Sequence, residues 1–269
     1  IGVGAFYGCS SLVSIDLPAT LTSIGDGAFG SCSALSSITF SATLTSIGNR
    51  AFECCSSLVY IDLPATLTSI GMQAFYYCSA LTSVTLPAGL TSIGDYAFEC
   101  CSSLAAISLP VGLTSIGNGA FSGTSLASVA FPASLVSIGD DAFYRCSSLA
   151  RVTFPATLTT IGGNAFARCS SLARVILPAG LTSIGHNAFD SCSALTSIHL
   201  PAALTSIGNG AFSGCTSLAY VAFPASLTSI DSAFWNCSSL ARVTFPAGLT
   251  SIGSLAFALC SSLSRVTVP

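Results

Sequence analysis

The chain has 269 residues, of which 51% are hydrophobic and only 6% are charged, and its mean hydropathy is +0.79. This composition excludes a disordered chain, because disordered segments lack the apolar residues that a packed core requires. Seven Arg, the absence of Lys and a pI near 5.0 exclude the clustered positive charge of a nucleic-acid-binding surface.

A repeat of 23 residues runs through the whole sequence, with the pattern I-G-x-x-A-F-x-x-C-S-S-L-x-x-I-x-L-P-A-x-L-T-S. Two units, those starting at Ile116 and Ile230, have only 22 residues. The units begin at Ile1, Ile24, Ile47, Ile70, Ile93, Ile116, Ile138, Ile161, Ile184, Ile207, Ile230 and Ile252. A unit of this length cannot bury its own apolar stripe, so stacked units must share one core. The repeat therefore predicts a β-rich solenoid of about twelve coils.

The unit opens with a chain reversal at Gly, as at Gly2, Gly25 and Gly48, and continues into an Ala-Phe pair that all units contain. We expect the Phe of each pair, such as Phe29 or Phe52, to lie on a short helical or 3-10 turn and to fill the interior. If the coils stack in register, these rings form a straight file along the solenoid.

The next element is a predicted strand, represented by Leu12 to Leu17 in the first unit. Its apolar and polar residues alternate with the two-residue period of a strand. Pro follows the strand in every unit except the second, where Ser41 replaces it, and Pro ends a strand because it has no N–H to donate. A short extended segment, such as residues 21–24, completes the unit with its two aliphatic ends turned inward.

The unit resembles the leucine-rich repeats of the bacterial surface antigen class, called BspA-like. Its Leu-x-x-Ile-x-Leu-Pro, Leu-x-x-Ile-Gly and Ala-Phe-x-x-Cys segments match that pattern over all 269 residues. The resemblance implies a parallel β-sheet on the concave side of the array. It also implies an extracellular or cell-surface protein that acts in adhesion, matrix binding or aggregation.

Eleven of the 13 Cys occupy one column of the repeat. They are Cys9, Cys32, Cys55, Cys78, Cys101, Cys146, Cys169, Cys192, Cys215, Cys237 and Cys260. We expect these thiols to face the core as small hydrophobic groups, because parallel side chains in a ladder suit a disulfide poorly. No Cys or His pair has the spacing of a zinc site, so we expect no metal.

Cys54 and Cys100 lie one place before this column and are expected to face outward. They are two coils apart, which is about 10 Å and exceeds the reach of a disulfide between them. Two interpretations remain open for them: an intermolecular disulfide or capped thiol, and a tolerated surface Cys.

Catalysis is not expected, and neither is a cofactor. The chain has only two His, His186 and His199, and no sequence feature directs a particular Ser or Cys at either one. No phosphate-binding Gly-rich loop, nucleophile elbow or paired carboxylate motif is present, since the Gly residues recur once per coil as turn formers.

The outward residues of the predicted strands form the candidate binding surface on the concave face. Four of the seven Arg stand in the single column that precedes the central residue of the strand. The candidate residues are Tyr60, Asp62, Arg151, Arg174, His199, Tyr220, Arg242 and Arg265. Adjacent Arg pairs repel each other unless solvent or an anionic partner offsets the charge. One hypothesis is therefore that this surface binds a partner protein or an acidic glycan, and the alternative is that it is merely the polar face of a solenoid.

Two further hypotheses remain. With so little charge and no polar caps, the array could self-associate as a building block of an extracellular filament or surface assembly. The regular Thr column, which runs from Thr22 to Thr250, is similar to the surfaces of ice-binding solenoids and could bind ice or polysaccharide.

The repeat predicts one domain over residues 1–269, interpreted as a segment of a longer protein because it opens inside the pattern. No apolar run approaches the roughly 18 residues of a membrane span, and no signal peptide is found. The sequon at Asn236 overlaps the Cys column, so its glycosylation is not expected.

Overall fold

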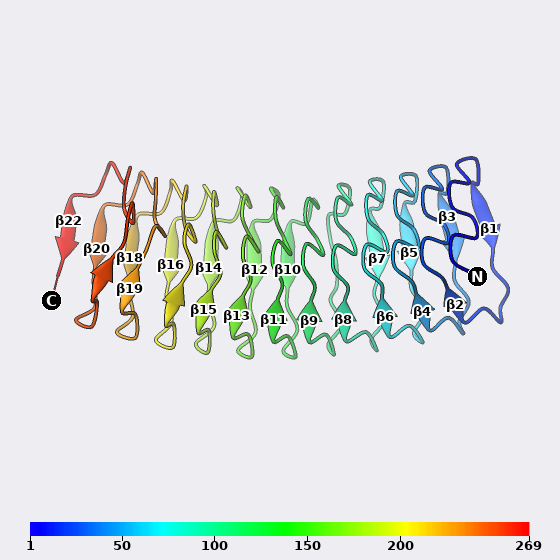
Figure 1. Cartoon of the computed structure of the whole chain (residues 1–269), viewed down its shortest axis with the longest axis horizontal. Helices are drawn as coiled ribbons and strands as arrows, with labels where there is room; N and C mark the ends of the chain where they lie inside the picture. Colours follow the sequence, from blue (N-terminus) through cyan, green and yellow to red (C-terminus); the bar gives the residue numbers. More distant parts are fainter. Residues whose placement is uncertain (269) are drawn as a thin grey trace.

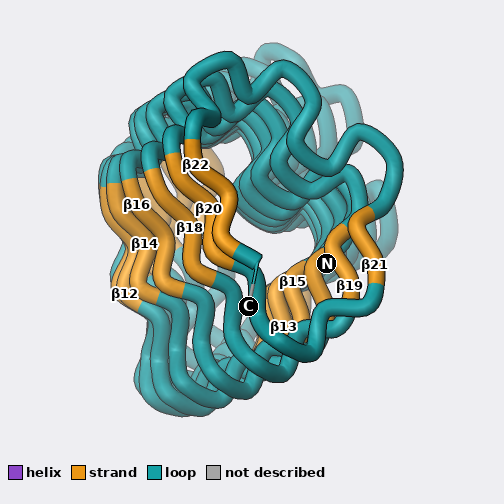
Figure 2. The backbone as a smooth tube through the Cα atoms, turned by 90° about the vertical axis from the view of Figure 1, so that its left-hand side faces the viewer, coloured by secondary structure: helices purple, strands orange, loops and turns teal. Residues whose placement is uncertain are grey.

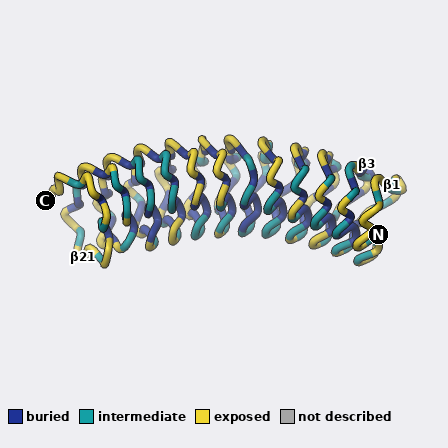
Figure 3. The backbone as a smooth tube through the Cα atoms, turned by 90° about the horizontal axis from the view of Figure 1, so that it is seen from above, coloured by how far each residue is buried: buried dark blue, intermediate teal, exposed yellow. Residues whose placement is uncertain are grey.

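The computed structural model describes residues 1–268 as a stack of coils, with the N-terminus at one end and the C-terminus at the other (Figure 1). Each coil follows one sequence unit, so equivalent residues recur along the stack. Seen from above, the stack is a gently bowed rod whose interior is lined by buried residues (Figure 3). The expected β-rich leucine-rich repeat solenoid is confirmed.

One row of strands is made of three-residue segments in which the central residue points into the core and the flanking residues point out. These strands are β1 (Ser14–Asp16), β3 (Ser37–Thr39), β5 (Tyr60–Asp62), β7 (Ser83–Thr85), β10 (Ser128–Ala130), β12 (Arg151–Thr153), β14 (Arg174–Ile176), β16 (Ser197–His199), β18 (Tyr220–Ala222), β20 (Arg242–Thr244) and β22 (Arg265–Thr267). Their outward residues form one surface, which we call the strand face.

A second row of two-residue strands lies on another side of the coils (Figure 2). It comprises β2 (Ser23–Ile24), β4 (Ser46–Ile47), β6 (Ser69–Ile70), β8 (Ser92–Ile93), β9 (Ser115–Ile116), β11 (Ser137–Ile138), β13 (Thr160–Ile161), β15 (Ser183–Ile184), β17 (Ser206–Ile207), β19 (Ser229–Ile230) and β21 (Ser251–Ile252). At the ends of the rod, β1 and β3 lie along one long edge and β21 along the other (Figure 3). All strand pairs are parallel and in register, as identical stacked units require.

The strand face is not one continuous sheet. Its hydrogen-bonded groups are β1-β3, β5-β7, β10-β12-β14-β16 and β18-β20-β22, whereas nine of the two-residue strands form a single sheet. Residues 106–108 form no strand, and the unit that follows them is one of the two short units.

The interior contains the expected file of Phe rings. Neighbouring rings along the column, from Phe6–Phe29 to Phe234–Phe257, have centroids 5.2–5.6 Å apart and planes within 18° of parallel. Other Phe rings, such as Phe40 and Phe131, meet this file edge-on. Equivalent side chains therefore lie in straight files, which confirms the stacking that the repeat predicts.

The Ala-Phe segments are turns, and residues 1–268 contain no helix, so the expectation of a helical turn is wrong. Successive amides alternate between bonds within a coil and bonds to the next coil. In the second coil, Ala28 N donates to Gly25 O at 3.2 Å, whereas Phe29 N donates to Ala51 O at 2.8 Å. Because every second amide bonds to a neighbour, no continuous helical ladder forms. Two left-handed residues in every coil except the eleventh, such as Arg50 (φ 54°) and Cys54 (φ 58°), accompany this alternation.

The sixth unit keeps the Cys position but fills it with Thr124. The Thr124 hydroxyl is buried, lies 2.8 Å from Phe121 O and is 3.2 Å from Cys146 Sγ of the next coil. The missing residue of this unit therefore belongs to the Ser-Ser pair that follows. Sequence alignment alone could not show this, because Thr124 can be placed in either column.

The close stacking of coils predicts unequal effects for two Gly substitutions. A Cβ at Gly185 would lie 2.5 Å from Gly162 C and 2.6 Å from Gly163 N, whereas a Cβ at Gly180 would come no closer than 3.5 Å to Ala156 O. We expect Gly185→Ala to lower the free energy of unfolding by about 1–3 kcal/mol through overpacking. Gly180→Ala should leave stability unchanged or raise it by up to about 1 kcal/mol.

Urea unfolding of the two variants beside the unsubstituted chain measures this difference. Equal midpoints for Gly185→Ala and Gly180→Ala would contradict the backbone contact at Gly185.

Candidate functional site

The strand face brings together most of the residues that the sequence singles out. Arg151 of β12 pairs in register with Arg174 of β14, and Arg242 of β20 pairs with Arg265 of β22. Tyr220 of β18 pairs with Arg242, so an aromatic ring adjoins the second Arg pair. His199 pairs with Ile176 in the column on the other side of the central residue. The six coils that contain β12 to β22 therefore present one row of outward residues with Arg and Tyr. A second row, with Ile176 and His199, lies beside it.

Tyr60 and Asp62 lie apart from the Arg residues, because both belong to β5, near the N-terminal end. The Tyr60 hydroxyl is 3.4 Å from Thr85 Oγ1 on the next strand, which holds the ring along the face. The structure thus divides the predicted surface into a Tyr-Asp part and an Arg-rich part.

Each part contains a shallow hollow. One, of about 410 Å³, is lined by Arg151, Thr153, Arg174 and Ile176, and the Ile176 side chain is 64% exposed. Another, of about 340 Å³, is bounded by Phe40, Tyr60 and Asp62. Both volumes lie at the lower end of the range of small-molecule sites, about 300–1,000 Å³, so these hollows suit side chains or single sugar residues of a larger partner.

Within the part of the chain that the structure describes, the Arg residues of the strand face have no carboxylate partner. The outward columns of β10 to β22 contain no Asp or Glu. The one side-chain ion pair within residues 1–268 joins Arg50 to Glu53 at 3.9 Å, and it lies in the turns. Stacked Arg residues therefore carry their charge into solvent from strands whose backbones lie about 4.8 Å apart.

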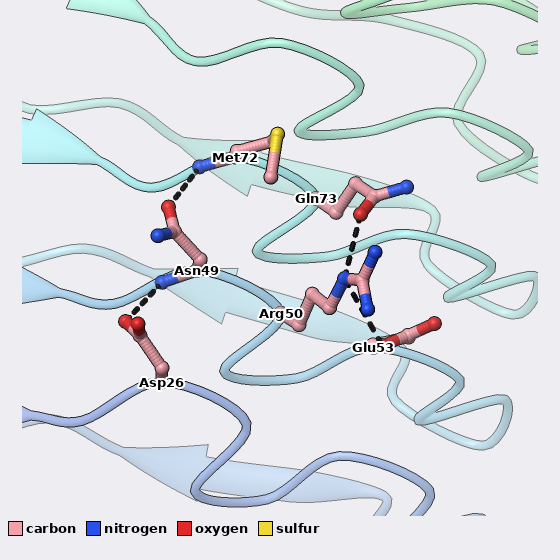
Figure 4. Close-up of polar contacts among 6 residues, drawn as sticks. All are labelled: Asp26, Asn49, Arg50, Glu53, Met72 and Gln73. Carbon is pink, nitrogen blue, oxygen red and sulfur yellow. Dashed lines mark hydrogen bonds and ion pairs between the residues drawn. The ribbon is translucent and has the colours of Figure 1, made fainter. Parts of the chain in front are cut away.

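The turns form a different surface, which we call the turn face, and a side-chain ladder stabilises it (Figure 4). In six coils, the side chain of the residue after the Gly accepts a bond from the backbone N–H of its equivalent in the next coil. Asp26 Oδ1 accepts from Asn49 N, and Asn49 Oδ1 accepts from Met72 N, both at 2.8 Å. In the same way, His186 Nδ1 accepts a bond from Asn209 N at 2.9 Å. Sequence reasoning missed this ladder, although the recurrence of Asp, Asn and His in one column is its signal.

The Cys column is buried from Cys32 onward, as expected, while Cys9 of the first coil is exposed. The thiols are not merely apolar, because ten of them donate to the carbonyl oxygen of a Phe in the preceding coil. Sγ–O distances are 3.1–3.3 Å, as in Cys55 Sγ to Phe29 O. Each bond links two coils inside the core, a role that the sequence analysis did not predict.

Cys54 and Cys100 are half-buried, and like all Cys of residues 1–268 they are free thiols. Burial raises the pKa of both thiols, and the nearby carboxylates of Glu53 and Glu99 raise it further. Both Cys have positive φ, which turns their side chains out of the Cys column. An intermolecular disulfide through either one stays a prediction.

Several hydroxyls of the Thr column are already engaged between coils. Thr45, Thr114, Thr182, Thr205 and Thr250 each donate to the backbone carbonyl of the equivalent residue in the preceding coil, at 2.9–3.2 Å. Their hydrogens are therefore not free for a regular array of bonds to ice.

Comparison with known proteins decides the family. A model of the BspA type leucine-rich repeat region matches residues 1–124, 68–196 and 182–269, which together span the chain. The chain belongs to this family. No curated protein sequence matches it.

Solved structures agree with this BspA-type assignment. A leucine-rich repeat protein from Bacteroides ovatus is 32% identical with a TM-score of 0.73, covering 99% of this chain and 81% of that protein. A leucine-rich cell surface protein from Faecalibacterium prausnitzii is 29% identical with a TM-score of 0.54, covering 95% and 87%. A leucine-rich repeat protein from Eubacterium ventriosum is 25% identical with a TM-score of 0.60, covering 88% and 73%.

BspA-type arrays are leucine-rich repeat proteins, a class that generally serves as a binding scaffold without enzymatic activity. Within the described part of this array, no three His, Cys, Asp or Glu side chains are grouped so that they could hold a metal ion. No helix of residues 1–268 has the length and apolar character needed to cross a bilayer.

Thiol accessibility gives a direct test of the Cys positions. At pH 8 we expect a thiol-disulfide reagent to modify three of the 13 thiols in the folded protein, Cys9, Cys54 and Cys100. The remaining thiols are buried, and burial also raises the pKa of Cys55 to about 12 and that of Cys78 well above its usual value, which keeps these two protonated. The thiolate is the reacting form. All 13 should react in guanidinium chloride.

The Cys54→Ser/Cys100→Ser double variant is the matched control and should leave one reactive thiol. On non-reducing electrophoresis, loss of a dimer band in this variant would support the intermolecular disulfide, whereas a monomer band in both proteins would rule it out. More than three reactive thiols in the folded protein would contradict the buried Cys column.

Proposed function

We propose that this BspA-type array is a non-catalytic binding protein of the cell surface that captures an acidic partner on its strand face. The observation that carries the proposal is the file of Arg151, Arg174, Arg242 and Arg265 on strands that contain no outward carboxylate. A chain with only 6% charged residues concentrates four of its seven Arg at this place.

The physical argument rests on repulsion between adjacent Arg residues. Arg151 and Arg174 are neighbours across a strand pair, and like charges in this arrangement destabilise the fold. A carboxylate, sulfate or uronate placed between them would remove that repulsion and accept charge-assisted hydrogen bonds from both guanidinium groups. Because binding removes this repulsion, the binding free energy becomes more favourable.

Tyr220 and Ile176 supply the apolar part of the interface. Tyr220 is 45% exposed beside Arg242, and Ile176 is 64% exposed beside Arg174. Aromatic and Arg side chains on a rigid surface are typical of the residues that dominate binding free energy at interfaces. Because the strands pair with strands of neighbouring coils, binding does not require the surface to become ordered.

Location at the cell surface is supported by similarity. The Faecalibacterium prausnitzii structure, which is 29% identical, is described as a leucine-rich cell surface protein. The family match spans the whole chain and agrees with a surface role. Adhesion to an acidic glycan or an acidic protein is the specific activity that we propose for this member.

A pair of charge-matched variants tests the proposal. Arg151→Ser/Arg174→Ser removes two charges from the strand face, and Arg145→Ser/Arg168→Ser removes two from the turn face, where both guanidinium groups lie against Tyr144. On an array of sulfated glycans, uronic-acid glycans and acidic peptides, we expect the first variant to bind at least about tenfold more weakly, since a charge-assisted hydrogen bond contributes roughly 1.5–3 kcal/mol. Binding should also weaken as salt is raised.

The turn-face variant has the same net charge as the strand-face variant. It should nevertheless bind as strongly as the unsubstituted chain. Equal losses in the two variants would reduce the effect to net charge, and retained binding in the strand-face variant would refute the proposed surface.

A further inference from the structure

The eleventh coil departs from the others at a single place. Its unit reads Ile230-Asp231-Ser232-Ala233-Phe234, and it is the only unit without Gly after the first Ile. The Phe ring and the following Cys keep their positions, since Phe234 stacks on Phe212 and Cys237 is buried. The loss of one residue is therefore absorbed entirely in the turn, where the coil is shorter than its neighbours.

The shortened turn leaves a buried backbone N–H without a partner. In nine successive coils, the N–H two places after the Gly donates to a carbonyl of the next coil, from Gly4 N to Asp26 O at 2.9 Å through Asn187 N to Asn209 O at 2.8 Å. The equivalent N–H of the tenth coil belongs to Gly210, which is buried, and no acceptor within residues 1–268 receives it. A buried donor without a partner costs about 1–3 kcal/mol, so this position favours an incoming acceptor.

A hollow of about 470 Å³ opens at this point of the turn face. It is lined by His186, Asn187, Asn209, Gly210, Ser232 and Trp235, among others. Trp235 is the single Trp of the chain and is 40% exposed. We call this hollow the eleventh-coil notch. It lies among the turns, whereas the Arg residues of the proposed binding surface lie on the strands.

The groups that line the notch are uncharged and rich in both donors and acceptors. His186 accepts at Nδ1 from Asn209 N, so its Nε2 carries the hydrogen and can donate. The Ser232 hydroxyl donates to Ser254 O at 2.7 Å and keeps its oxygen free to accept. Neither Asp, Glu nor Arg lines the notch. Such a set matches a neutral ligand with many hydroxyl groups rather than an ion.

We propose that the eleventh-coil notch binds a neutral saccharide. One apolar face of a pyranose ring would pack on the Trp235 indole, which offers a large flat surface with a polar edge. A hydroxyl or acetamido oxygen would accept the Gly210 N–H, and the amide and hydroxyl groups around it would bind the remaining hydroxyls. The volume of the notch lies within the range of about 300–1,000 Å³ that small-molecule sites occupy.

Gly210 itself fits this role. It has positive φ, and a Cβ there would collide with Asn187 Oδ1. Only Gly leaves both the N–H and the Asn187 amide open to the notch. The site therefore depends on two sequence features, the missing Gly of the eleventh unit and the Gly at position 210.

Insertion of one Gly between Ile230 and Asp231 is the decisive variant, because it restores the pattern Ile-Gly-Asp that the second unit has at Ile24-Gly25-Asp26. The restored turn should supply the acceptor for Gly210 N–H and close the notch while retaining Trp235. Since the missing bond is regained, the variant should unfold at the same urea concentration as the original chain or at a higher one.

Trp235 fluorescence reports binding directly, as no other Trp contributes. We expect titration with oligosaccharides of galactose, glucose and N-acetylglucosamine to give a saturable change with at least one of them. The insertion variant should show at least a tenfold weaker response to that sugar. Tyr144→Ala removes an aromatic residue at the equivalent turn position of another coil and should bind as the original chain does.

Three results would overturn the proposal. The first is that no neutral sugar gives a saturable fluorescence change. The second is that the insertion variant binds as strongly as the original chain, and the third is that Tyr144→Ala weakens binding as much as the insertion does. Arg151→Ser/Arg174→Ser should leave the fluorescence titration unchanged, so failure of the strand-face function and failure of the notch are separate observations.

Discussion

The structure depends on the direct stacking of one coil on the next. At the Gly that follows the first Ile of most units, the backbones approach so closely that a side chain would collide with the preceding coil, as the position of Gly185 against Gly162 shows. This contact sets the spacing that places the Phe rings face to face and brings Cys Sγ within hydrogen-bonding distance of a Phe carbonyl. Stability is thus a sum of similar contributions between neighbours, and each coil needs another to satisfy its backbone.

The same stacking turns a sequence column into a surface. Residues 23 positions apart become neighbours, so a bias in one column, such as the four Arg beside the strand centre, becomes a charged file. The two surfaces described above differ in origin. The Arg file is a matter of side-chain choice within the regular array, whereas the eleventh-coil notch is a local departure from the array itself.

The sequence was sufficient to predict the stack, the inward Phe and Cys columns and the neighbouring Arg residues, because each follows from periodicity alone. It was insufficient for features that depend on hydrogen-bond geometry. The turns at Ala28 and Phe29 are not helical, since alternate amides bond to the next coil. The thiol of Cys55 donates to a carbonyl, and Asp26 and His186 form part of a ladder. Gly210 N–H lost its partner through a deletion in a different unit, which no local pattern around Gly210 reveals.

The alternation of amide bonds in the turns also has a mechanical meaning. Half of these bonds close a loop inside one coil, and the other half run along the axis of the rod to the adjacent coil. A force along the axis of the rod stretches only the bonds between adjacent coils. All the bonds of one junction share that force. The rod therefore resists elongation until one junction yields, and the junction beside Gly210, which lacks one bond of the turns, is weaker in its turns than the junctions that have the full set.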